Sequence, residues 1–452
     1  MARPNPRLQA SAQRYLNRRL EHALRYGPAH SETDIQRAPA LSVAVGIGLT
    51  AVGAVGCLVF SLVRPPAELP DAPILMERRS GALYVRIEDT VHPVLNLTSA
   101  RLIAGRADDP EPVSDAALET AKYGVQVGIP GAPARIGVPL DDTRWTVCDS
   151  GSTAAIAGAG QQLPEIADPV LVAGPTGTAY LLYAGQRAAL DPADPAVARA
   201  LGLSGITARP VSATLLNLIP EVVPIAVPRI PGAGNPATGA LAGLSVGDVI
   251  RVQRASATEY FVVLDGGVQR IGPVAADLIR AGGLHGATAV PTVSEATLRA
   301  VPTLAVLPTD TYPERPAQMA DHETLCATWI AGDVTLSTGD QPPLPEGHAT
   351  VRLASADGAG PALDEVYVAP GRSVYVRPDG SGSTTGSLVA GTGVRFAIPD
   401  AGTARVLGLP DIPAPAPAAV LAALPAGPVL DRQDALLGRD VITTGPSQSG
   451  ER

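Results

Sequence analysis

Two of the three cysteines are the residues of this sequence best placed to do covalent chemistry. Cys148 and Cys326 each lie three positions from a tryptophan, in the runs Trp145-Thr-Val-Cys148 and Cys326-Ala-Thr-Trp329. Trp145 and Trp329 are the only tryptophans in the chain. Residues three apart on a β-strand point to opposite faces, so each Trp and its Cys are expected on different faces. We expect these two β-type segments to form a structural centre flanked by the tryptophans.

A disulfide between Cys148 and Cys326 is the bond that this pattern favours. The third cysteine, Cys57, lies in a long apolar run, which leaves an even pair for an oxidising compartment. Two unrelated thiols or a metal pair are the alternatives, but the six histidines show no ligand spacing that would complete a metal site. Closing a loop of 178 residues would stabilise the fold by about 5 kcal/mol through the entropy of the unfolded chain. We expect a disulfide and no metal.

The sequence contains no residue pattern that indicates a catalytic site. A phosphate-binding P-loop needs a lysine after a glycine-rich turn, and the only lysine, Lys122, follows Glu119-Thr-Ala. The run Gly243-Leu-Ser245-Val-Gly247 matches the form of a nucleophile elbow, but it leads into a strand and not a helix. We therefore assign no catalytic residue and no cofactor.

A membrane-spanning helix is expected over residues 41–63. These 23 residues carry no charge, and a helix of this length is about 35 Å long, enough to cross a hydrocarbon core of about 30 Å. Residues 1–38 hold seven arginines and three acidic residues, a net charge of +4, while the rest of the chain has a net charge of −13. The arginine bias predicts a cytoplasmic N-terminus and an exported body. A cleaved signal peptide and a lipoprotein modified at Cys57 are the alternatives, and both fit the length of the leader and span poorly.

Two further patterns suggest contacts on the membrane side of the chain. Small residues recur every fourth position in the span, which would let another helix approach closely; they include Gly46, Thr50, Ala54 and Gly53. Residues 8–25 predict an amphipathic basic helix that would lie on anionic lipid or dock on a partner's cytoplasmic domain. Its contact residues would include Arg14, Tyr15, Arg18 and Arg19. No basic patch with aromatic residues follows in the body, so no nucleic-acid partner is expected.

The body shows internal repetition. Four segments, starting at Leu83, Ala179, Glu259 and Ser387, each predict a β-hairpin followed by short helices. The cysteine-bearing stretches lie between the first and second repeats and between the third and fourth, so they are expected to join as one central domain. The predicted fold class is α+β: one transmembrane helix and an elongated, pseudo-two-fold extracytoplasmic region with a disulfide-bridged centre and four repeat domains.

The predicted parts follow one another along the chain. They are a basic cytoplasmic tail (1–40), the transmembrane helix (41–63), repeat domain 1 (71–121), central domain part a (122–168), repeat domain 2 (169–230), repeat domain 3 (241–302), central domain part b (303–358), repeat domain 4 (359–440) and a disordered tail (441–452).

Taken together, these features resemble the EccB family of type VII (ESX) secretion systems. The resemblance rests on the tail run Arg14-Tyr-Leu-Asn-Arg-Arg-Leu20, the single span, the run from Pro93 to Leu102, Trp145-Thr-Val-Cys148-Asp149 and the later Cys326. It covers nearly the whole chain. It implies a subunit in the inner membrane of actinobacteria, with a central domain surrounded by four repeats akin to a phage lysin's cell-wall-binding subunit.

The resemblance also implies partners. These are an EccC-type ATPase, EccD and EccE membrane subunits, the mycosin protease and copies of the chain itself. Family members are sometimes described as ATPases, so ATP follows as a cofactor from that description alone. We expect a non-enzymatic scaffold that supports protein export. An ATPase with an unrecognised site and a peptidoglycan-binding envelope module are the alternatives.

Overall fold

The structure is a computed structural model that describes residues 6–26, 37–62, 69–254, 257–283, 289–318, 323–358, 360–383 and 385–440. It divides into two compact units, Met1–Leu69 and Pro70–Arg452. Val63, the last residue of the expected span, and the tail 441–452 lie outside the described residues.

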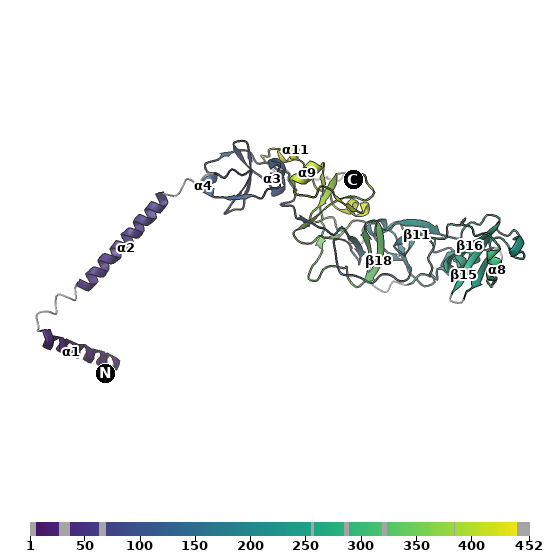
Figure 1. Cartoon of the computed structure of the whole chain (residues 1–452), viewed down its shortest axis with the longest axis horizontal. Coiled ribbons are helices and arrows are strands. Elements are labelled where there is room, and N and C mark those ends of the chain that lie inside the picture. Colours follow the sequence, from purple (N-terminus) through teal and green to yellow (C-terminus); the bar gives the residue numbers. More distant parts are fainter. Residues whose placement is uncertain are drawn as a thin grey trace, which may run out of the picture. The chain divides into compact units, whose positions relative to one another are not determined.

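The described residues of the first unit form two helices, α1 (Pro6–Tyr26) and α2 (Arg37–Leu62) (Figure 1). Both lie where the apolar patterns predict them. Within α2, the 18 residues Ser42–Val59 have a mean hydropathy of 2.1, and none of them is buried against other parts of the chain. In the part of the chain that the structure describes, α2 is the one helix long and apolar enough to cross a membrane.

The described residues of the second unit combine α-helices with antiparallel hairpins, and their strands form five sheets. The first sheet has the strand order β4-β1-β2-β3-β5. Its elements are β1 (Ile74–Glu77), β2 (Leu83–Ile87), β3 (Thr90–Pro93), α3 (Leu97–Ala104), β4 (Glu111–Val113), α4 (Asp115–Leu118) and β5 (Lys122–Tyr123).

The segments that form the second and third sheets have the same plan, a β-hairpin together with two short helices. The second, ordered β12-β9-β10-β11-β13, contains β9 (Val170–Ala173), β10 (Ala179–Tyr183), β11 (Gln186–Leu190), α5 (Pro195–Ala200), β12 (Arg209–Pro210), α6 (Ala213–Leu218) and β13 (Glu221–Ile225). The third contains the 3-10 helix Gly239–Leu241, β14 (Val249–Gln253), β15 (Thr258–Leu264), β16 (Gly267–Ile271), α7 (Pro273–Gly282) and α8 (Glu295–Arg299).

The fourth sheet repeats this plan once more, ordered β23-β22-β21-β24, and β6 (Val138–Pro139) joins it along β21. Its other elements are β21 (Arg372–Pro378), β22 (Gly386–Val389), β23 (Arg395–Ile398), α9 (Ala401–Val406), β24 (Ala414–Ala416), α10 (Ala418–Ala423) and α11 (Arg432–Ala435).

The central sheet has six strands in the order β18-β17-β7-β8-β20-β19. They are β7 (Trp145–Asp149), β8 (Thr153–Ala157), β17 (Thr324–Ile330), β18 (Asp333–Gly339), β19 (Val351–Arg352) and β20 (Glu365–Tyr367). Two hairpins, β7-β8 and β17-β18, meet along the β7–β17 pair.

Local sequence explains why the short helices form where they do. Asn96 caps α3 because its Oδ1 accepts a hydrogen bond from the Ser99 backbone N–H at 2.8 Å. Gly105 ends α3 in the left-handed conformation, with φ at 70°. Ser212 caps α6 in the same way as Asn96 caps α3, through the Leu215 backbone N–H.

Neighbouring sheets share hydrophobic cores. One core joins the first and fourth sheets through residues such as Val85 and Phe396, and another joins the second and third through residues such as Val197 and Leu278. The largest core joins the central sheet to the second and fourth. Because apolar burial is the main favourable term in folding, each hairpin depends on its neighbours for stability.

Boundaries at three places differ from the sequence prediction. Val138 and Pro139, expected in central domain part a, form β6 and pair with β21 of the fourth sheet. Residues 365–367, expected in repeat domain 4, form β20 and pair with β8 in the central sheet. Lys122 and Tyr123, expected in the central domain, form β5 and pair with Thr90 and Val91 of β3. All three strands are only two or three residues long, so they carry no periodic pattern from which the sequence could predict them.

Candidate functional site

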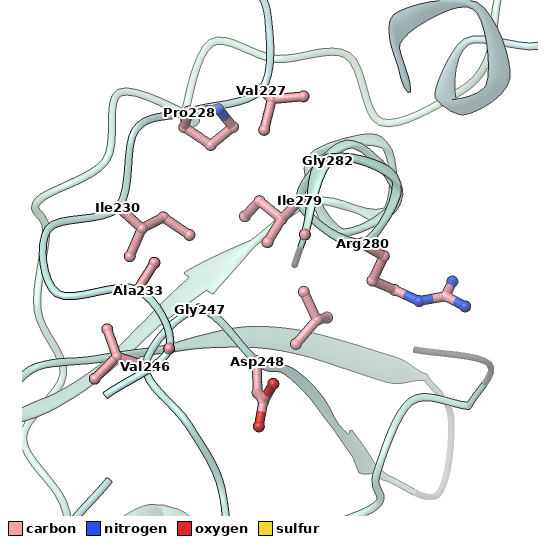
Figure 2. Close-up of a pocket in the computed structure, with 13 residues that line it drawn as sticks. Val227, Pro228, Ile230, Ala233, Val246, Gly247, Asp248, Ile279, Arg280 and Gly282 are labelled. Carbon is pink, nitrogen blue, oxygen red and sulfur yellow. The ribbon is translucent and has the colours of Figure 1, made fainter. Parts of the chain in front are cut away.

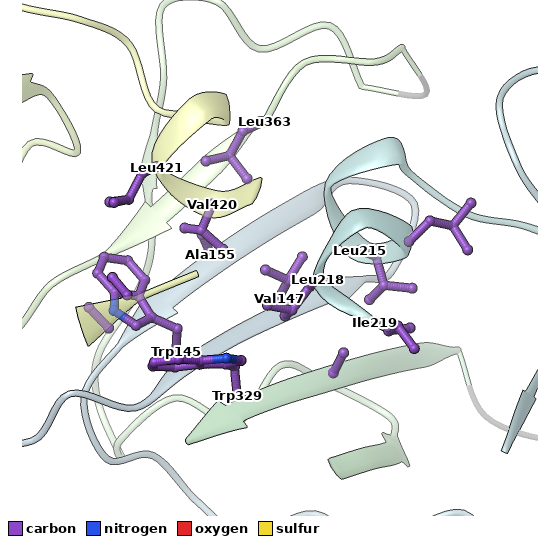
Figure 3. Packing of buried hydrophobic residues seen from close by; sticks show 14 of the residues in the cluster. Trp145, Val147, Ala155, Leu215, Leu218, Ile219, Trp329, Leu363, Val420 and Leu421 are labelled. Atoms are coloured by element: carbon purple, nitrogen blue, oxygen red, sulfur yellow. The ribbon is translucent and has the colours of Figure 1, made fainter. Parts of the chain in front are cut away.

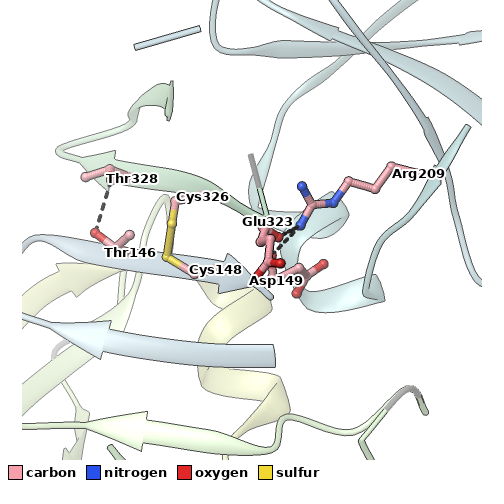
Figure 4. The surroundings of a disulfide bond; sticks show 7 residues. All are labelled: Thr146, Cys148, Asp149, Arg209, Glu323, Cys326 and Thr328. Carbon is pink, nitrogen blue, oxygen red and sulfur yellow. Dashed lines mark hydrogen bonds between the residues drawn. A yellow bond between two sulfur atoms is a disulfide. The ribbon is translucent and has the colours of Figure 1, made fainter. Parts of the chain in front are cut away.

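The two predicted cysteines meet at the seam of the central sheet. β7 and β17 are antiparallel, with Cys148 directly opposite Cys326. A disulfide joins them, the Cα atoms are 4.1 Å apart, and both residues are fully buried (Figure 4). The structure therefore confirms the predicted disulfide, which links segments 178 residues apart.

The tryptophans lie on the other face of the same strands. Trp145 pairs directly with Trp329 across the β7–β17 seam, and both side chains are buried in the largest core (Figure 3). The cystine packs with Ile156 in a separate, smaller cluster. The expected division of Trp and Cys between opposite faces is thus observed.

Helices of the second and fourth sheets cover the tryptophan face. Leu215 and Leu218 of α6 and Val420 and Leu421 of α10 belong to the same core as the tryptophans (Figure 3), and α6 contacts α10. The seam is therefore held by a covalent bond on one face and by a large apolar core on the other.

Hydroxyl groups flank the disulfide along its own face. Thr146 and Thr328 lie directly opposite each other, and their Oγ1 atoms are 3.1 Å apart (Figure 4). This hydrogen bond satisfies two polar groups beside the buried sulfur atoms. The threonine pair thus adds a second cross-strand contact between the two hairpins, next to the disulfide on the same face.

An arginine joins both cysteine strands to the second sheet. The Nη2 atom of Arg209 donates a hydrogen bond to the Asp149 carbonyl oxygen at 2.8 Å, and it also donates to the Glu323 carbonyl oxygen (Figure 4). Asp149 ends β7, and Glu323 immediately precedes β17. One guanidinium therefore ties together three segments that are far apart in the sequence.

The Asp149 side chain makes a second connection to the second sheet. It is 6% exposed, and its Oδ2 accepts a hydrogen bond from the Ser212 backbone N–H at 2.6 Å. Burial raises the pKa of this carboxyl above its ordinary value, while hydrogen bonds from Ser212 and Thr153 and the charge of Arg209 oppose the rise. The sequence did not predict a role for Arg209 or Ser212, although a serine before the apolar run 213–218 is a recognisable helix start.

The small residues predicted for helix packing lie on α2. Gly46, Thr50 and Ala54 follow one another at four-residue spacing, and Gly53 falls on the same side at 100° per residue. The Thr50 hydroxyl donates to the Gly46 carbonyl oxygen at 2.8 Å, so its polar group is satisfied within the helix. Apart from the adjacent backbone of α2, a side-chain carbon added at Gly46 or Gly53 would lie within 4 Å of no atom in the described part of the chain. This side of α2 is therefore free of contacts within the described chain.

The predicted contact residues of the tail lie on α1. Arg14, Tyr15, Arg18 and Arg19 are all exposed. The Arg14 Nε donates to the Ala10 carbonyl oxygen of the preceding turn at 3.3 Å. α1 thus presents a basic and partly apolar surface to its surroundings.

One pocket lies between α7 and the segment that precedes the third sheet (Figure 2). It has a volume of about 130 Å³, and Val227, Ile230, Val246 and Ile279 give it mainly apolar walls. Ligand pockets for small molecules usually measure about 300–1,000 Å³. This one is closer to the size of a single aliphatic side chain.

Two larger pockets, of about 310 and 440 Å³, lie at the central sheet and beside the second sheet. Each has one arginine, and each arginine is paired with an aspartate: Arg144 with Asp142 at 3.6 Å, and Arg315 with Asp168 at 3.1 Å. A binding site for a nucleoside triphosphate needs several convergent cations or backbone N–H groups that contact the phosphates. The single arginine of each pocket is accompanied by acidic residues, Glu165 in one pocket and Asp168, Asp310 and Glu314 in the other, so neither resembles such a site.

Lys122 and Ser245 do not line either of the two larger pockets. Lys122 is exposed on the edge strand β5. The Ser245 backbone N–H donates to Asp248 Oδ2 at 2.7 Å in the turn before β14, as expected for an ordinary turn. Within the described ranges, no group of three or more His, Cys, Asp or Glu residues could hold a metal ion.

A membrane-crossing helix followed by a disulfide-bridged α+β body defines the class of this protein: a membrane-anchored protein with its folded part outside the bilayer. The family described as "Type VII secretion system ESX-1, transport TM domain B" matches residues 2–444. The chain belongs to this family, the EccB proteins of type VII secretion systems.

Curated relatives match over almost the whole length. The chain is 36% identical to the "ESX-3 secretion system ATPase EccB3" of Mycolicibacterium smegmatis, covering 98% of this chain and 92% of that protein. It is 33% identical to the "ESX-5 secretion system ATPase EccB5" of Mycobacterium tuberculosis, covering 96% and 94%.

Solved structures agree with this relationship. A chain in the structure of an intact ESX-5 inner membrane complex has a TM-score of 0.72 and 31% identity, covering 100% of this chain and 99% of that one. The structure of an EccB3 dimer from the ESX-3 core complex has a TM-score of 0.73 and 33% identity, covering 81% and 100%. The resemblance found in the sequence is confirmed.

Proposed function

We propose that this protein is a core structural subunit of an ESX-type inner membrane complex and supports protein export. The observation that carries the proposal is the match of the full chain, including the anchor, to a subunit of an intact ESX-5 inner membrane complex. α2 supplies the anchor, and the five-sheet body supplies the surface for assembly.

The body lies on the periplasmic side, and the N-terminus lies in the cytoplasm. A structure of the periplasmic assembly from the ESX-5 complex matches 86% of this chain with a TM-score of 0.72, which supports the exported position of the body. The seven arginines before α2 support the orientation. Alkaline phosphatase fused after residue 440 should be active, and a fusion at residue 26 should be inactive; the reverse pattern would overturn the topology.

The partners are copies of the chain and other membrane subunits of the machine. The dimer formed by the related EccB3 supports self-association. EccC-type ATPase, EccD, EccE and the mycosin protease are the further partners that we infer from the family.

The four hairpin units and the centre form a pseudo-two-fold arrangement. α5 of the second sheet packs on α7 of the third, α3 of the first packs on α9 of the fourth, and α6 and α10 contact each other near the centre. A two-fold axis that exchanges the first sheet with the third, and the second with the fourth, would map the α5–α7 contact onto the α9–α3 contact. The same axis would map the α6–α10 contact onto itself. Superposing the two pairs by a single rotation tests this, and a poor fit of the helices would reject it.

The subunit supports export through its structure and not through nucleotide hydrolysis of its own. The related proteins are named ATPases, whereas the arginines in the two larger pockets of this chain are paired with aspartates. Purified chain should show no ATP hydrolysis above that of a mock preparation. A rate that follows the homogeneous protein and is lost on a single substitution in this chain would establish the ATPase alternative.

The central experiment separates anchoring from export. Residues 1–64 are replaced by a cleavable signal peptide, so that the body is exported without its anchor. We expect the released body to fold but to be missing from the purified membrane complex. Recovery of an intact complex that contains the unanchored body would contradict the proposed role.

A further inference from the structure

α1 has an apolar face that no described part of its own unit covers. Tyr15, Leu16, Leu20 and Leu24 are 63%, 55%, 60% and 86% exposed. Leu16, Leu20 and Leu24 recur every four residues, which places them on one side of the helix, and Tyr15 lies about 100° away from Leu16. Four large apolar side chains in contact with water are unfavourable, so this face is suited to a contact outside the described fold.

The opposite face of α1 is basic. At 100° per residue, Arg14, Arg18 and Arg25 project away from the apolar face, and Arg19 lies at its border. Glu21 is the only acidic residue among the 21 of the helix. Such a charge excess favours an anionic surface as the occupant.

The chain itself holds α1 close to a membrane. α1 ends at Tyr26 and α2 begins at Arg37, so the ten residues between them span at most about 40 Å even when fully extended. This tether gives α1 a high effective concentration at the bilayer surface. A helix with five arginines cannot cross the bilayer itself.

We propose that α1 lies in the plane of the membrane interface, with its leucine face in the acyl boundary and its arginines among anionic lipid headgroups. Helices with a polar, arginine-rich face and a leucine-rich opposite face bind membranes in this way. The proposal rests on the proposed function only for the choice of the cytoplasmic leaflet. It makes α1 a second, charge-dependent membrane contact that fixes the direction in which the tail leaves α2.

A pair of adjacent positions tests this in the full-length protein. Cys57→Ser removes the free thiol, and Ser11→Cys or Ala12→Cys then places a nitroxide label on the polar or the apolar side of α1 at nearly the same height along the helix. The protein is reconstituted in nanodiscs of phosphatidylglycerol mixed with phosphatidylcholine, or of phosphatidylcholine alone. Nanodiscs expose both bilayer faces, so the result does not depend on topology or on complex assembly.

We expect the label at position 12 to collide several-fold less often with a water-soluble nickel chelate than the label at position 11, and to remain accessible to oxygen. Phosphatidylcholine alone, or Arg14→Gln combined with Arg18→Gln, should reduce this difference. Equal nickel accessibility at both positions on anionic discs would overturn the proposal. Shielding of position 12 from both nickel and oxygen, or shielding only after other membrane subunits are added, would show a protein contact instead and would also overturn it.

Discussion

Trp145 lies directly opposite Trp329 across the same pair of strands in which Cys148 bonds to Cys326. The order of residues is Trp then Cys on β7 and Cys then Trp on β17. In an antiparallel pair, this order places Trp opposite Trp and Cys opposite Cys. The two tryptophans face the largest core and the cystine faces the other side. The seam therefore combines a covalent link with burial of the two largest side chains of the chain.

Removing the disulfide should weaken the central sheet strongly. Cys148→Ser combined with Cys326→Ser should lower the free energy of unfolding by about 3–5 kcal/mol, because the loop of 178 residues is no longer closed in the unfolded chain. Urea unfolding followed by tryptophan fluorescence measures this well, since both tryptophans of the protein lie at this seam.

The matched control for this variant is Cys57→Ser, which alters the free cysteine on α2 and should leave the unfolding midpoint unchanged. Protein denatured without reductant should titrate one thiol, and reduced protein should titrate three. An unchanged midpoint for the double variant would show that the tryptophan core alone holds the seam.

Arg209 should contribute to stability through backbone carbonyls. Arg209→Met removes the hydrogen bonds to the carbonyl oxygens of Asp149 and Glu323 and should lower the free energy of unfolding by about 2–3 kcal/mol. Arg209→Lys should recover only part of this loss, because an ammonium lacks the planar geometry of the guanidinium.

Arg299→Met is a suitable control for the arginine variant. The Arg299 side chain is 74% exposed and pairs with Glu295 within α8, so its loss should change stability by less than about 0.5 kcal/mol. Equal effects at positions 209 and 299 would indicate that the contact at the seam contributes little.

Asp149 should give the central sheet a distinctive pH dependence. Burial raises the pKa of its carboxyl, so the folded chain binds the proton more tightly than the unfolded chain does. Stability then falls as pH rises through the window between the ordinary pKa of about 4 and the raised folded pKa. Asp149→Asn should remove this fall, since an amide oxygen can still accept the hydrogen bond from the Ser212 backbone N–H.

The measurement is the urea midpoint of wild type and variant across that window. Asp400→Asn serves as a comparison of opposite sign, because hydrogen bonds from Thr403 lower the pKa of Asp400. The contribution of Asp400 to folding stability is therefore lost as pH falls through its folded pKa. A wild type and an Asp149→Asn variant with parallel pH profiles would contradict the role assigned to the carboxyl.

The sequence predicted the features that rest on local pattern or on composition. The apolar run gave α2, the period of the tail gave α1, and the paired Trp–Cys runs indicated the disulfide and its two-sided environment. Arg209 was not found, because its acceptors are backbone carbonyls brought to it from 60 and 114 residues away. Strand β20 was also misplaced, since its three residues join β8 only once the central sheet has formed.

The small residues of α2 give a test of helix packing in the membrane. At 100° per residue, Gly46 and Gly53 lie on one side of α2 and Gly48 lies on the opposite side. Apart from the adjacent backbone of α2 itself, an added side-chain carbon at any of the three would lie within 4 Å of no atom of the described residues, so substitution should leave the subunit folded. Gly46→Leu combined with Gly53→Leu should reduce recovery of the membrane complex several-fold, because bulky side chains prevent another helix from approaching closely.

Gly48→Leu is the matched control, with the same chemistry on the opposite side of the same helix. It should leave complex recovery near the wild-type level, as measured by size-exclusion chromatography of the detergent-extracted complex. Equal losses for the control and the double variant would indicate a general effect of bulk in the span. Equal recovery of both would show that the contact side of α2 faces lipid, and that assembly depends on the body alone.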